Sequence, residues 1–511
     1  MKTVRLRDVL IDLDATILPA ACDPLLTGLS DDSKRVQSGQ LFVAVRGTRH
    51  DGHAFIEEAI LRGAAAVCVD RQHLPVNGQP TGHVTWVGVP DTRAALGRIA
   101  ERFSGGAVRR LTLGAVTGTN GKTTTTCYME RMLEAAGHQV GRLGTIAHRV
   151  GRRVVPATNT TPGTLELHAY FAQMVEYGMD WCVMEASSHA LDQGRTAGID
   201  FAVRVFTNLA SDHLDYHRTR EQYYLAKRRL FEQLPPRTVV AVNLDDPAGR
   251  RLCSFVRGAQ PRARLVTYAL TTPADVHGHI LAATLEGSRV RLTTPSGVFE
   301  VTTPLLGRHN VYNLLAAASG LWMHGLAPTA IQQGAERLHV VPGRVERVEG
   351  PEGVQVLIDY AHTEEALVQV LRALRPLTPG RLIVVFGCGG DRDRTKRPAM
   401  GRAAAELADV VVVTTDNPRS EDPAAIARDI TGGCPPGFHG LLVELDRFTA
   451  IQRALARARA GDVVVIAGKG HEVYQVLKDT TIPFDDRESV RTALALARLA
   501  TPPVGHRESV G

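Results

Sequence analysis

Four short apolar runs in the last third of the chain constrain its fold most strongly. They are VLIDY (356–360), LIVVFG (382–387), DVVVVTT (409–415) and DVVVIAG (462–468), and helix-like stretches such as FTAIQRALARARA (448–460) separate them. Strands that alternate with helices predict a mostly parallel, doubly wound sheet. Each run is followed by a polar segment (AHT, CGGDRD, DNPRS and KGHE). Because such sheets bind ligands at the carboxyl ends of their strands, we expect these segments to form one site.

The whole chain is longer than a single hydrophobic core usually organises. At 511 residues, two to three domains are expected. Residues 1–110 alternate strand-like and helical patterns and end in a glycine-bearing segment at 105–110. Residues 111–340 open with another buried-strand pattern, and a turn at 341–344 precedes the regular block described above. The sequence therefore predicts an α/β protein with domains at 1–110, 111–340 and 341–511.

The charge balance limits the kinds of ligand that the chain is expected to bind. The formal net charge is +6 and the pI is about 9.0, without a long block of like charges. Such a mildly basic surface suits small anionic substrates, and no motif typical of nucleic-acid binding is present. Seven cysteines without C-x-x-C spacing predict reduced thiols. No apolar run approaches the ~20 residues of a membrane span, so we expect a cytoplasmic protein.

A glycine-rich segment between a strand pattern and a helix pattern gives the strongest chemical signal. Glycines let backbone N–H groups surround phosphate oxygens, a lysine adds a positive charge, and a hydroxyl can bind Mg²⁺. The general phosphate-loop pattern would place glycine at position 116, where this chain has Val116. A simple glycine turn that opens a helix is the alternative. The strand and helix on either side favour a phosphate loop made of Gly118, Thr119, Asn120, Gly121, Lys122, Thr123 and Thr124.

Two polar residues downstream extend this prediction to a metal site. Glu185 follows the apolar run WCVM, and His213 follows VRVFTNL. Mg²⁺ takes oxygen ligands beside phosphate oxygens, and occasionally a histidine. Either residue alone would more often be structural or solvated. Together with the phosphate loop they favour a site for ATP and Mg²⁺.

A set of ordered motifs then resembles one family across essentially the whole chain. The motifs, in order, are GTNGKTT, NTTPG, MEASSH, TNLASDHLDYH, YYLAKRRLF, GRHNVYN, GRVE, DYAHT, GCGGDRD, DNPR and GKGHE. In this combination the sequence resembles the Mur ligases of peptidoglycan synthesis. The resemblance implies a three-domain architecture with a domain that binds the UDP-substrate, a central P-loop ATPase and a Rossmann-like C-terminal domain that binds an amino acid. It also implies an ATP-dependent ligase that forms a C–N bond through an acyl phosphate.

The resemblance implies roles for individual residues. Contacts to the UDP-sugar and the muramoyl dipeptide are implied for Ser33, Thr48, Arg49, His50, Asn159, Thr160, Thr161, Ser187, Gln193 and Arg195. Nucleotide contacts beyond the phosphate loop are implied for His309, Asn310, Asn313 and Arg344. Two sites depart from the family pattern, Asp31 beside the expected uracil and Glu364 in place of the proline after DYAHT.

Metal ligands and catalytic residues also follow from the resemblance. Thr123, Glu185, His213 and Lys227 are implied as ligands of one or two Mg²⁺ ions, and Lys122, Lys227 and His213 as catalytic residues. The lysine that matches Lys227 is carbamylated in this family, which turns a cation into an anionic oxygen ligand. From the helical pattern alone, Lys227 would be an ordinary solvated lysine.

The segment DNPR indicates which amino acid is added. Meso-2,6-diaminopimelate differs from lysine by a carboxylate at its far end, and an arginine can hold a carboxylate with two parallel hydrogen bonds. Arg419 therefore predicts meso-diaminopimelate as the substrate that joins the D-glutamate of UDP-N-acetylmuramoyl-L-alanyl-D-glutamate. The alternative is a proline turn with a surface arginine. The other contacts implied for this substrate are Arg392, Asp416, Asn417, Pro418, Gly468 and Glu472.

Several competing functions remain open at this point. They are a lysine-adding ligase of the same family, another ligase of the pathway, a folylpolyglutamate synthetase and a nucleotide-binding relative without catalysis. A nucleic-acid motor is disfavoured, because no second helicase-like motif set is visible. We expect a monomer that binds only small molecules.

Overall fold

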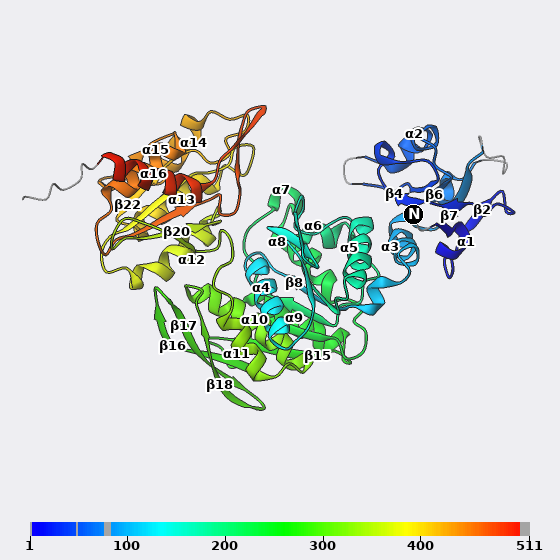
Figure 1. The fold of residues 1–511 in the computed structure, drawn as a ribbon, viewed down its shortest axis with the longest axis horizontal. Coiled ribbons are helices and arrows are strands. Elements are labelled where there is room, and N and C mark those ends of the chain that lie inside the picture. Colours follow the sequence, from blue (N-terminus) through cyan, green and yellow to red (C-terminus); the bar gives the residue numbers. More distant parts are fainter. Residues whose placement is uncertain (1–2, 48–49, 76–82, 501–511) are drawn as a thin grey trace, which may run out of the picture. The chain divides into compact units, whose positions relative to one another are not determined.

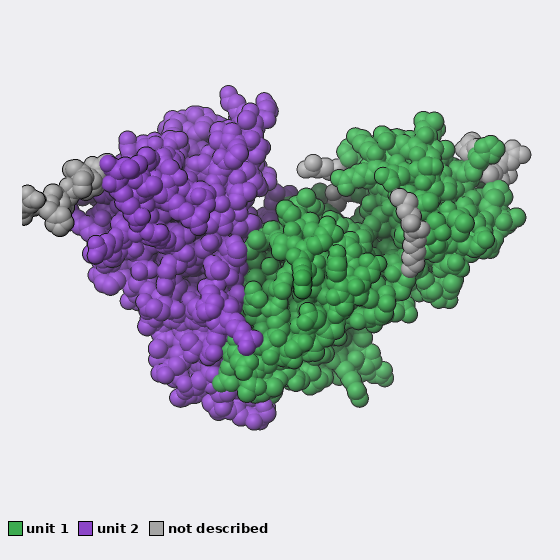
Figure 2. Space-filling view, viewed as in Figure 1, with its two compact units in different colours: residues 1–209, 216–276, 315–334 green, residues 210–215, 277–314, 335–511 purple. Residues whose placement is uncertain are grey.

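The computed structural model describes residues 3–47, 50–75 and 83–500, and Figure 1 shows its helices and strands. The chain divides into two compact units (Figure 2). The first holds residues 1–209, 216–276 and 315–334, and the second holds residues 210–215, 277–314 and 335–511. Each unit has hydrophobic cores of its own.

The N-terminal part of the first unit is a small α/β sheet. Its spatial order is β2-β7-β6-β5-β4; β4 to β7 are parallel, and β2 is antiparallel to β7. Apolar side chains pack on both faces, as expected for a parallel sheet. The bounds are β1 Val4–Arg5, α1 Leu6–Val9, β2 Thr16–Leu18, β3 Leu25–Leu26, β4 Gly28–Ser30, β5 Gln40–Val43, α2 Ile56–Leu61, β6 Ala66–Asp70, β7 Thr85–Val89 and α3 Thr92–Phe103.

The rest of the first unit contains a larger sheet with β8 (Thr112–Thr117) in its middle. The spatial order is β11-β10-β9-β12-β8-β13-β14-β15, parallel from β9 to β15 and antiparallel at β10 and β11. Strands β9 to β12 lie on one side of β8, and β13 to β15 lie on the other side. The strand order therefore reverses at β8, which makes it a topological switch point. The other strands are β9 Val140–Leu143, β10 Ala147–Val150, β11 Arg153–Pro156, β12 Trp181–Glu185, β13 Val203–Phe206, β14 Val239–Asn243 and β15 Arg264–Ala269.

Helices cover this central sheet. They are α4 Lys122–Ala135, α5 Thr164–Glu176, α6 Ser188–Asp192, α8 Arg220–Arg228 and α9 Pro247–Ala259. The helices α7 Leu214–His217, α10 Arg308–His324 and α11 Pro328–Glu336 contribute residues to both units. The start of α9 is capped by Asp246, whose carboxylate accepts the backbone N–H groups of Ala248 and Gly249.

The second unit contains the doubly wound sheet that the four apolar runs predict. Its order is β19-β20-β24-β21-β22-β23, and the four predicted strands lie side by side as β20, β24, β21 and β22. Apolar clusters on both faces bury it. The strands of this sheet are β19 Glu346–Val348, β20 Gln355–Asp359, β21 Leu382–Phe386, β22 Val410–Val413, β23 Leu441–Val443 and β24 Val463–Ala467. Outside this sheet, β16 Val276–Thr284, β17 Gly287–Thr294 and β18 Gly297–Thr303 pair antiparallel in that order, and β25 Tyr474–Leu477 pairs antiparallel with β26 Thr480–Pro483.

The helices of the second unit lie between these strands along the chain. They are α12 Glu364–Leu374, α13 Lys396–Leu407, α14 Pro423–Thr431, α15 Arg447–Arg457 and α16 Asp486–Ala500. The predicted helix at 448–460 ends earlier, because Ala458 is already extended (φ −71°, ψ 146°). All seven cysteines lie in the described residues and are free thiols. Among the described residues, no helix combines the length and apolar character needed to cross a membrane.

One buried histidine makes the stability of the first unit depend on pH. His168 on α5 is 3% exposed, and among the described residues neither ring nitrogen has a hydrogen-bond partner. Burial lowers its pKa from 6.5 to about 4. Below pH 6.5 the unfolded chain therefore takes up a proton that the folded chain does not, so stability falls as the pH falls toward 4.

We expect His168→Leu to remove this acid sensitivity. Between pH 7.5 and pH 5 the variant should lose about 2 kcal/mol less unfolding free energy than the parent protein. Urea unfolding at the two pH values measures the difference. His279→Gln on β16 is the control, since His279 is exposed, and an equal acid loss in parent and His168→Leu would refute the assignment.

Candidate active site

The predicted phosphate loop lies at the carboxyl end of β8 and leads into α4. Gly118 has φ +154°, and a Cβ there would lie 1.9 Å from the Oγ1 of Thr207. The N–H of Asn120 donates to the Oδ1 of Asn208 (2.9 Å), whose amide returns a bond to the Asn120 carbonyl (3.1 Å). Thr207 and Asn208, which follow β13, therefore shape the loop. Neither residue was predicted from the sequence, although both stand at the end of a predicted strand.

Two lysine ammonium groups meet at one carbonyl of this loop. Lys122 donates to the carbonyls of Gly118 (3.0 Å) and Thr119 (2.9 Å). Lys227 on α8 donates to the same Gly118 carbonyl (2.7 Å), and its Nζ lies 4.4 Å from the ring centre of Tyr223. Lys227 is only 1% exposed. The helical pattern alone predicted a solvated lysine, and this prediction is wrong. The side chain of Lys227 points from α8 into the protein interior, beside the phosphate loop.

Glu185 ends β12, the strand next to β8, and its side chain is fully buried. Its carboxylate accepts the N–H of Thr145 (2.9 Å) and the Thr145 hydroxyl (3.0 Å). That hydroxyl also lies 3.1 Å from the Oγ1 of Thr160. A Cβ at Gly144 would lie 2.3 Å from the Glu185 carboxylate. Only glycine therefore allows the backbone at position 144 to approach this carboxylate so closely. Thr145 was missed in the sequence, where a lone threonine carries no signal.

The predicted contacts to the muramoyl dipeptide form a connected network. The Thr161 hydroxyl donates to the Glu185 carbonyl (2.8 Å) and accepts the N–H of Ser187 (3.0 Å). Arg195 donates to the Thr161 carbonyl (2.9 Å) and, through Nε and Nη2, to the Oε1 of Gln193 (2.9 and 2.6 Å). Four of the predicted residues are thus brought together. Asn159 is exposed outside this network.

The N-terminal sheet carries the residues predicted to contact the UDP-sugar. Ser33 is buried and donates to the Oε2 of Glu58 (2.7 Å), whereas His50 and Asp31 are exposed. Thr48 and Arg49 lie outside the described residues. Arg93 on α3 donates to the Gln193 carbonyl (2.9 Å) and so links this sheet to the dipeptide network.

A cluster in the same sheet resembles a metal site by composition but not by geometry. One ligand atom each of His53, Asp70 and His73 lies within 4.8 Å of the others. However, the Nε2 of His53 already accepts the N–H of Asp70 (3.0 Å), and its Nδ1 lies 2.6 Å from Asp51. The rings of His53 and His73 stack at 4.0 Å with a 22° interplanar angle, so their nitrogens cannot point at one ion. We interpret the cluster as structural.

The remaining predicted nucleotide and metal residues belong to the second unit. His213 has φ +54° and lies 3.5 Å from Asp212. Asn310 is buried and donates to the Leu306 carbonyl (2.7 Å), and Asn313 donates to the Oδ1 of Asn310 (3.0 Å). Burial, assisted by the nearby Arg344 cation, lowers the pKa of His309 to about 4, which keeps this ring neutral at pH 7.

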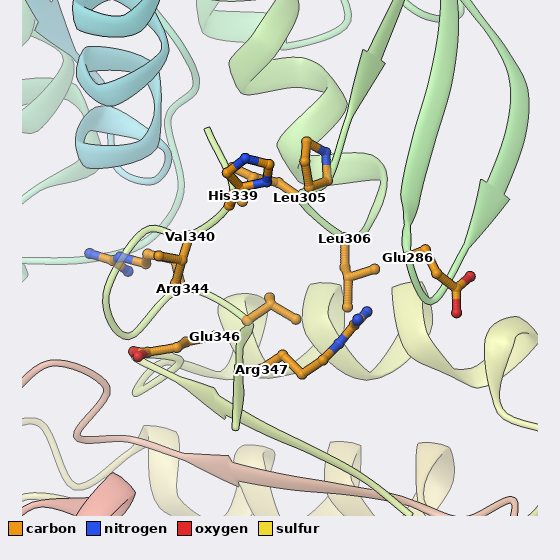
Figure 3. Close-up of a pocket in the computed structure, with 10 residues that line it drawn as sticks. Glu286, Leu305, Leu306, His339, Val340, Arg344, Glu346 and Arg347 are labelled. Carbon is orange, nitrogen blue, oxygen red and sulfur yellow. The ribbon is translucent and has the colours of Figure 1, made fainter. Parts of the chain in front are cut away.

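A cavity of about 280 Å³ lies beside Arg344 in the same unit (Figure 3). Leu305 and Leu306 give it an apolar part, and Glu346 and Arg347 add charged groups. The Arg344 guanidinium also lies 4.8 Å from the ring centre of Tyr360, just after β20. Arg344 thus connects the cavity to the carboxyl end of the doubly wound sheet.

The polar segments after the strands of that sheet meet as predicted. Arg419 has φ +52°, and its Nη1 donates to the Gly390 carbonyl (2.7 Å). A Cβ at Gly390 would lie 1.8 Å from the Pro418 carbonyl, so the two segments touch through their backbones. Asn417 donates to the Oε2 of Glu472 (2.9 Å).

Other members of the predicted set lie at the edges of this cluster. Asp416 is buried, and a Cβ at Gly468 would lie 3.2 Å from its Oδ2. Arg392 is exposed and donates to the Asp391 carbonyl (3.1 Å). Glu364, which replaces the proline of the family pattern, is the first residue of α12. It follows the N-cap residue Thr363, whose hydroxyl accepts the N–H of Ala366.

A buried ion pair, not recognised in the sequence, ties these segments together. Glu421 accepts Arg397 (2.9 Å) and Arg394 (2.9 Å), and also the backbone N–H of Asp391 (2.7 Å). Arg397 is 1% exposed. The pair therefore holds the segment with Arg392 against the segment with Arg419.

Comparison with known proteins is consistent with this arrangement. Three family descriptions match in order: "Mur ligase family, catalytic domain" at residues 26–104, "Mur ligase middle domain" at 116–320 and "Mur ligase, glutamate ligase domain" at 343–470. A Gloeobacter violaceus protein named UDP-N-acetylmuramoyl-L-alanyl-D-glutamate–2,6-diaminopimelate ligase is 46% identical over 98% of this chain and 99% of its own length. A Solibacter usitatus protein of the same name is 44% identical over 95% and 96%.

Solved structures give the same result for the fold. A structure of a UDP-N-acetylmuramoyl-L-alanyl-D-glutamate–2,6-diaminopimelate ligase has a TM-score of 0.70 and 34% identity, and it covers 97% of this chain and 100% of its own. A Thermotoga maritima MurF ligase in complex with ADP has a TM-score of 0.61 and 21% identity, over 92% and 98%. At that identity the second likeness concerns the fold alone.

Proposed function

The chain belongs to the Mur ligase family, and we propose that it adds meso-2,6-diaminopimelate to the D-glutamate of UDP-N-acetylmuramoyl-L-alanyl-D-glutamate, at the expense of ATP, in peptidoglycan precursor synthesis. The observation that carries this proposal is the near-complete match, at 46% and 44% identity, to relatives named as diaminopimelate ligases. The protein is therefore an enzyme that forms a C–N bond. We assign its domains as 1–110, 111–340 and 341–511.

The segment around Arg419 supports the choice of amino acid. Its backbone is fixed at φ +52°, and its N–H donates to the Val476 carbonyl (3.1 Å). A guanidinium held in this way is suited to a carboxylate, which diaminopimelate has at its far end and lysine lacks. Asp416, Asn417, Pro418, Gly468 and Glu472 lie around it, with Arg392 at the exposed edge.

The phosphate loop would hold the phosphates of ATP. Gly118 to Thr124 supply backbone N–H groups and the start of α4, and Lys122 supplies a cation. We assign His309, Asn310, Asn313 and Arg344 to the nucleotide as well. Ser33, His50, Thr161, Ser187, Gln193 and Arg195 are assigned to the UDP-linked dipeptide, together with Asn159, Thr160 and the undescribed Thr48 and Arg49.

The residues present fit Mg²⁺, which accompanies ATP in such reactions. Glu185 offers a buried carboxylate, and Thr123 offers a hydroxyl at the start of α4, both beside the phosphate loop. His213 and a carbamylated Lys227 complete the proposed ligand set. Bound there, Mg²⁺ would neutralise charge on the phosphate groups.

The chemistry needs no protein nucleophile. A carboxylate oxygen of the D-glutamate takes the γ-phosphoryl group of ATP, which gives an acyl phosphate and ADP. The amine then attacks the acyl carbon, so that the C–N bond forms as phosphate leaves and the amine loses a proton. Lys122 stabilises the charge on the transferring group, and the Thr161–Arg195 network orients the dipeptide. We further propose a cytoplasmic monomer without nucleic-acid partners, in keeping with seven free thiols.

Phosphate release by the purified protein tests the proposal. The assay contains ATP, Mg²⁺ and UDP-N-acetylmuramoyl-L-alanyl-D-glutamate, with either meso-diaminopimelate or L-lysine. We expect release that depends on meso-diaminopimelate. Preference for L-lysine would retain the ligase but replace its substrate, and no release with either would favour the non-catalytic relative.

Arg419→Lys tests the specificity. We expect kcat/KM for meso-diaminopimelate to fall about 10-fold to 100-fold, because an ammonium cannot form the paired hydrogen bonds of a guanidinium. Activity with L-lysine should change little. Arg402→Lys, at an exposed position on α13, is the matched control. An equal loss with both amino acids would show that Arg419 only supports the loop.

A further inference from the structure

Lysine is rare in this chain, and one buried lysine, Lys469, has no role in the proposed function. The sequence has 7 lysines and 52 arginines. Lys34 and Lys478 are exposed, but two lysines are completely buried, Lys227 (1% exposed) and Lys469 (0%). At these two buried positions the chain keeps the compact ammonium of lysine, although it also buries guanidinium groups at Arg397 and Arg447. Lys227 lies at the phosphate loop. Lys469 lies among the residues assigned to the amino-acid substrate.

Lys469 follows β24 at the carboxyl edge of the doubly wound sheet and is surrounded by acceptors. Its Nζ lies 3.1 Å from the Oε2 of Glu472, 3.2 Å from the Oδ1 of Asn417 and 3.8 Å from the Oδ1 of Asp416. The first two contacts are hydrogen bonds, and the third is an ion pair at longer distance. The side chain therefore serves as an internal cation for the segments 416–419 and 468–472.

The contacts of Asn417 show what this cation organises. Its Oδ1 accepts both Lys469 and the backbone N–H of Val476 (3.0 Å), so its Nδ2 must face Glu472. Both contacts to Glu472 use the same oxygen, Oε2. Among the described residues, the Oε1 of Glu472 has no hydrogen-bond partner, and the buried Oδ1 of Asp416 has none either. Lys469 thus faces both carboxylates, through a hydrogen bond to the Oε2 of Glu472 and an ion pair at 3.8 Å with the Oδ1 of Asp416, and it leaves the Oε1 of Glu472 for a ligand.

The charges of the segments 416–419 and 468–472 balance only when Lys469 is included. Asp416 and Glu472 are two anions, and Arg419 and Lys469 are two cations. The far end of meso-diaminopimelate carries one ammonium and one carboxylate, so it is neutral overall. The far end of L-lysine carries only the ammonium. A cluster without net charge suits the first ligand, and a cluster with one excess negative charge suits the second.

We propose that Lys469 is a specificity-determining residue, which balances Asp416 and Glu472 so that the site accepts the zwitterionic end of a diamino dicarboxylate in preference to a simple cationic end. The proposal rests on the proposed function. Lys469 acts as a positioning residue, through Asn417 and the two carboxylates, and its ammonium stays inside the protein.

Lys469→Met, which keeps the length of the side chain and removes its charge, tests this role. The ratio of kcat/KM for meso-diaminopimelate to that for L-lysine should fall about tenfold or more, mainly through KM for meso-diaminopimelate. The KM values for ATP and for the UDP-linked dipeptide should stay unchanged. A purely structural role would instead lower activity with both amino acids equally, and that result would overturn the proposal. Arg402→Met on α13 is the control.

A charge-restoring variant keeps the test decisive if Lys469→Met is unstable. Lys469→Met combined with Asp416→Asn removes one charge of each sign, and we expect it to recover part of the lost preference compared with Lys469→Met alone. A double variant with no better preference, while its thermal unfolding matches the single variant, would overturn the proposal. The unchanged protein tests the proposed function itself. If it uses neither amino acid, the proposed function fails. If it uses meso-diaminopimelate but Lys469→Met has the same ratio of the two kcat/KM values, the function stands and the role of Lys469 is refuted.

Discussion

Lys122→Ala is expected to reduce turnover by about 1,000-fold or more while leaving the UDP-linked substrate bound. The ammonium lies at the start of α4 and donates to the Gly118 and Thr119 carbonyls, within the loop that would surround the phosphates of ATP. Phosphoryl transfer depends on neutralising charge on the transferring group, and no protein nucleophile shares that task. Phosphate release measures turnover, and calorimetry measures binding of the UDP-linked dipeptide.

The control for this variant lies on the same helix. Arg131→Ala removes a cation of α4 that is 41% exposed and paired with Glu134 (2.7 Å), and it should leave turnover nearly unchanged. Lys122→Arg should have a turnover close to that of Lys122→Ala, because a guanidinium is larger than the ammonium that the loop holds. Turnover by Lys122→Ala near the level of the unchanged protein would contradict the role of the loop.

The strand patterns predicted the fold well because parallel strands buried on both faces read as continuous apolar runs. All four runs of the C-terminal block became neighbouring strands, and the polar segments after them met at one edge. Strands β19 and β23 were not predicted. Each has only three residues, so neither carries enough apolar pattern to stand out. The end of α15 was placed too late because alanine and arginine continue past Arg457 with good helix propensity.

The site was predictable where a residue type carries its own chemical signal. Lys122 and the glycines of the phosphate loop could be recognised directly, because that chemistry requires them at that spacing. Thr145 and Asn208 could not, since a neutral polar side chain looks the same in a surface turn and in a site. Their roles depend on partners far along the chain: Thr145 meets Glu185, and Asn208 meets Asn120.

Burial of charged residues was the other property that the sequence could not provide. Lys227 is 109 residues from Gly118 along the chain, and a helical pattern shows which residues share a face but not what that face meets. Lys469 similarly gains two of its three neighbours, Asp416 and Asn417, from a distant segment, with Asn417 lying 52 residues away along the chain. In both cases the physical reason for burial is a set of acceptors that only the folded sheet brings together.

Lys227→Ala is expected to lower kcat by about 100-fold or more. If the proposed carbamate forms, the neutral amine of Lys227 adds to CO₂, an N–C bond forms and a proton is released, which leaves an anionic oxygen ligand beside the phosphate loop. Lys227→Arg should then be as inactive as Lys227→Ala, because a guanidinium stays protonated and is not carbamylated. Arg228→Ala, one residue along α8 and partly exposed in a pair with Glu232 (3.1 Å), is the control and should stay active.

The arginine variant separates the two possible roles of this buried lysine. The ammonium form has partners of its own, the Gly118 carbonyl at 2.7 Å and the Tyr223 ring at 4.4 Å, so a purely cationic role is physically reasonable. That role predicts partial activity in Lys227→Arg and no response to CO₂. The carbamate predicts that removal of CO₂ and bicarbonate lowers the activity of the unchanged protein and that bicarbonate restores it. Activity in Lys227→Arg together with indifference to CO₂ would rule out the carbamate and leave Lys227 as a cation that shapes the loop.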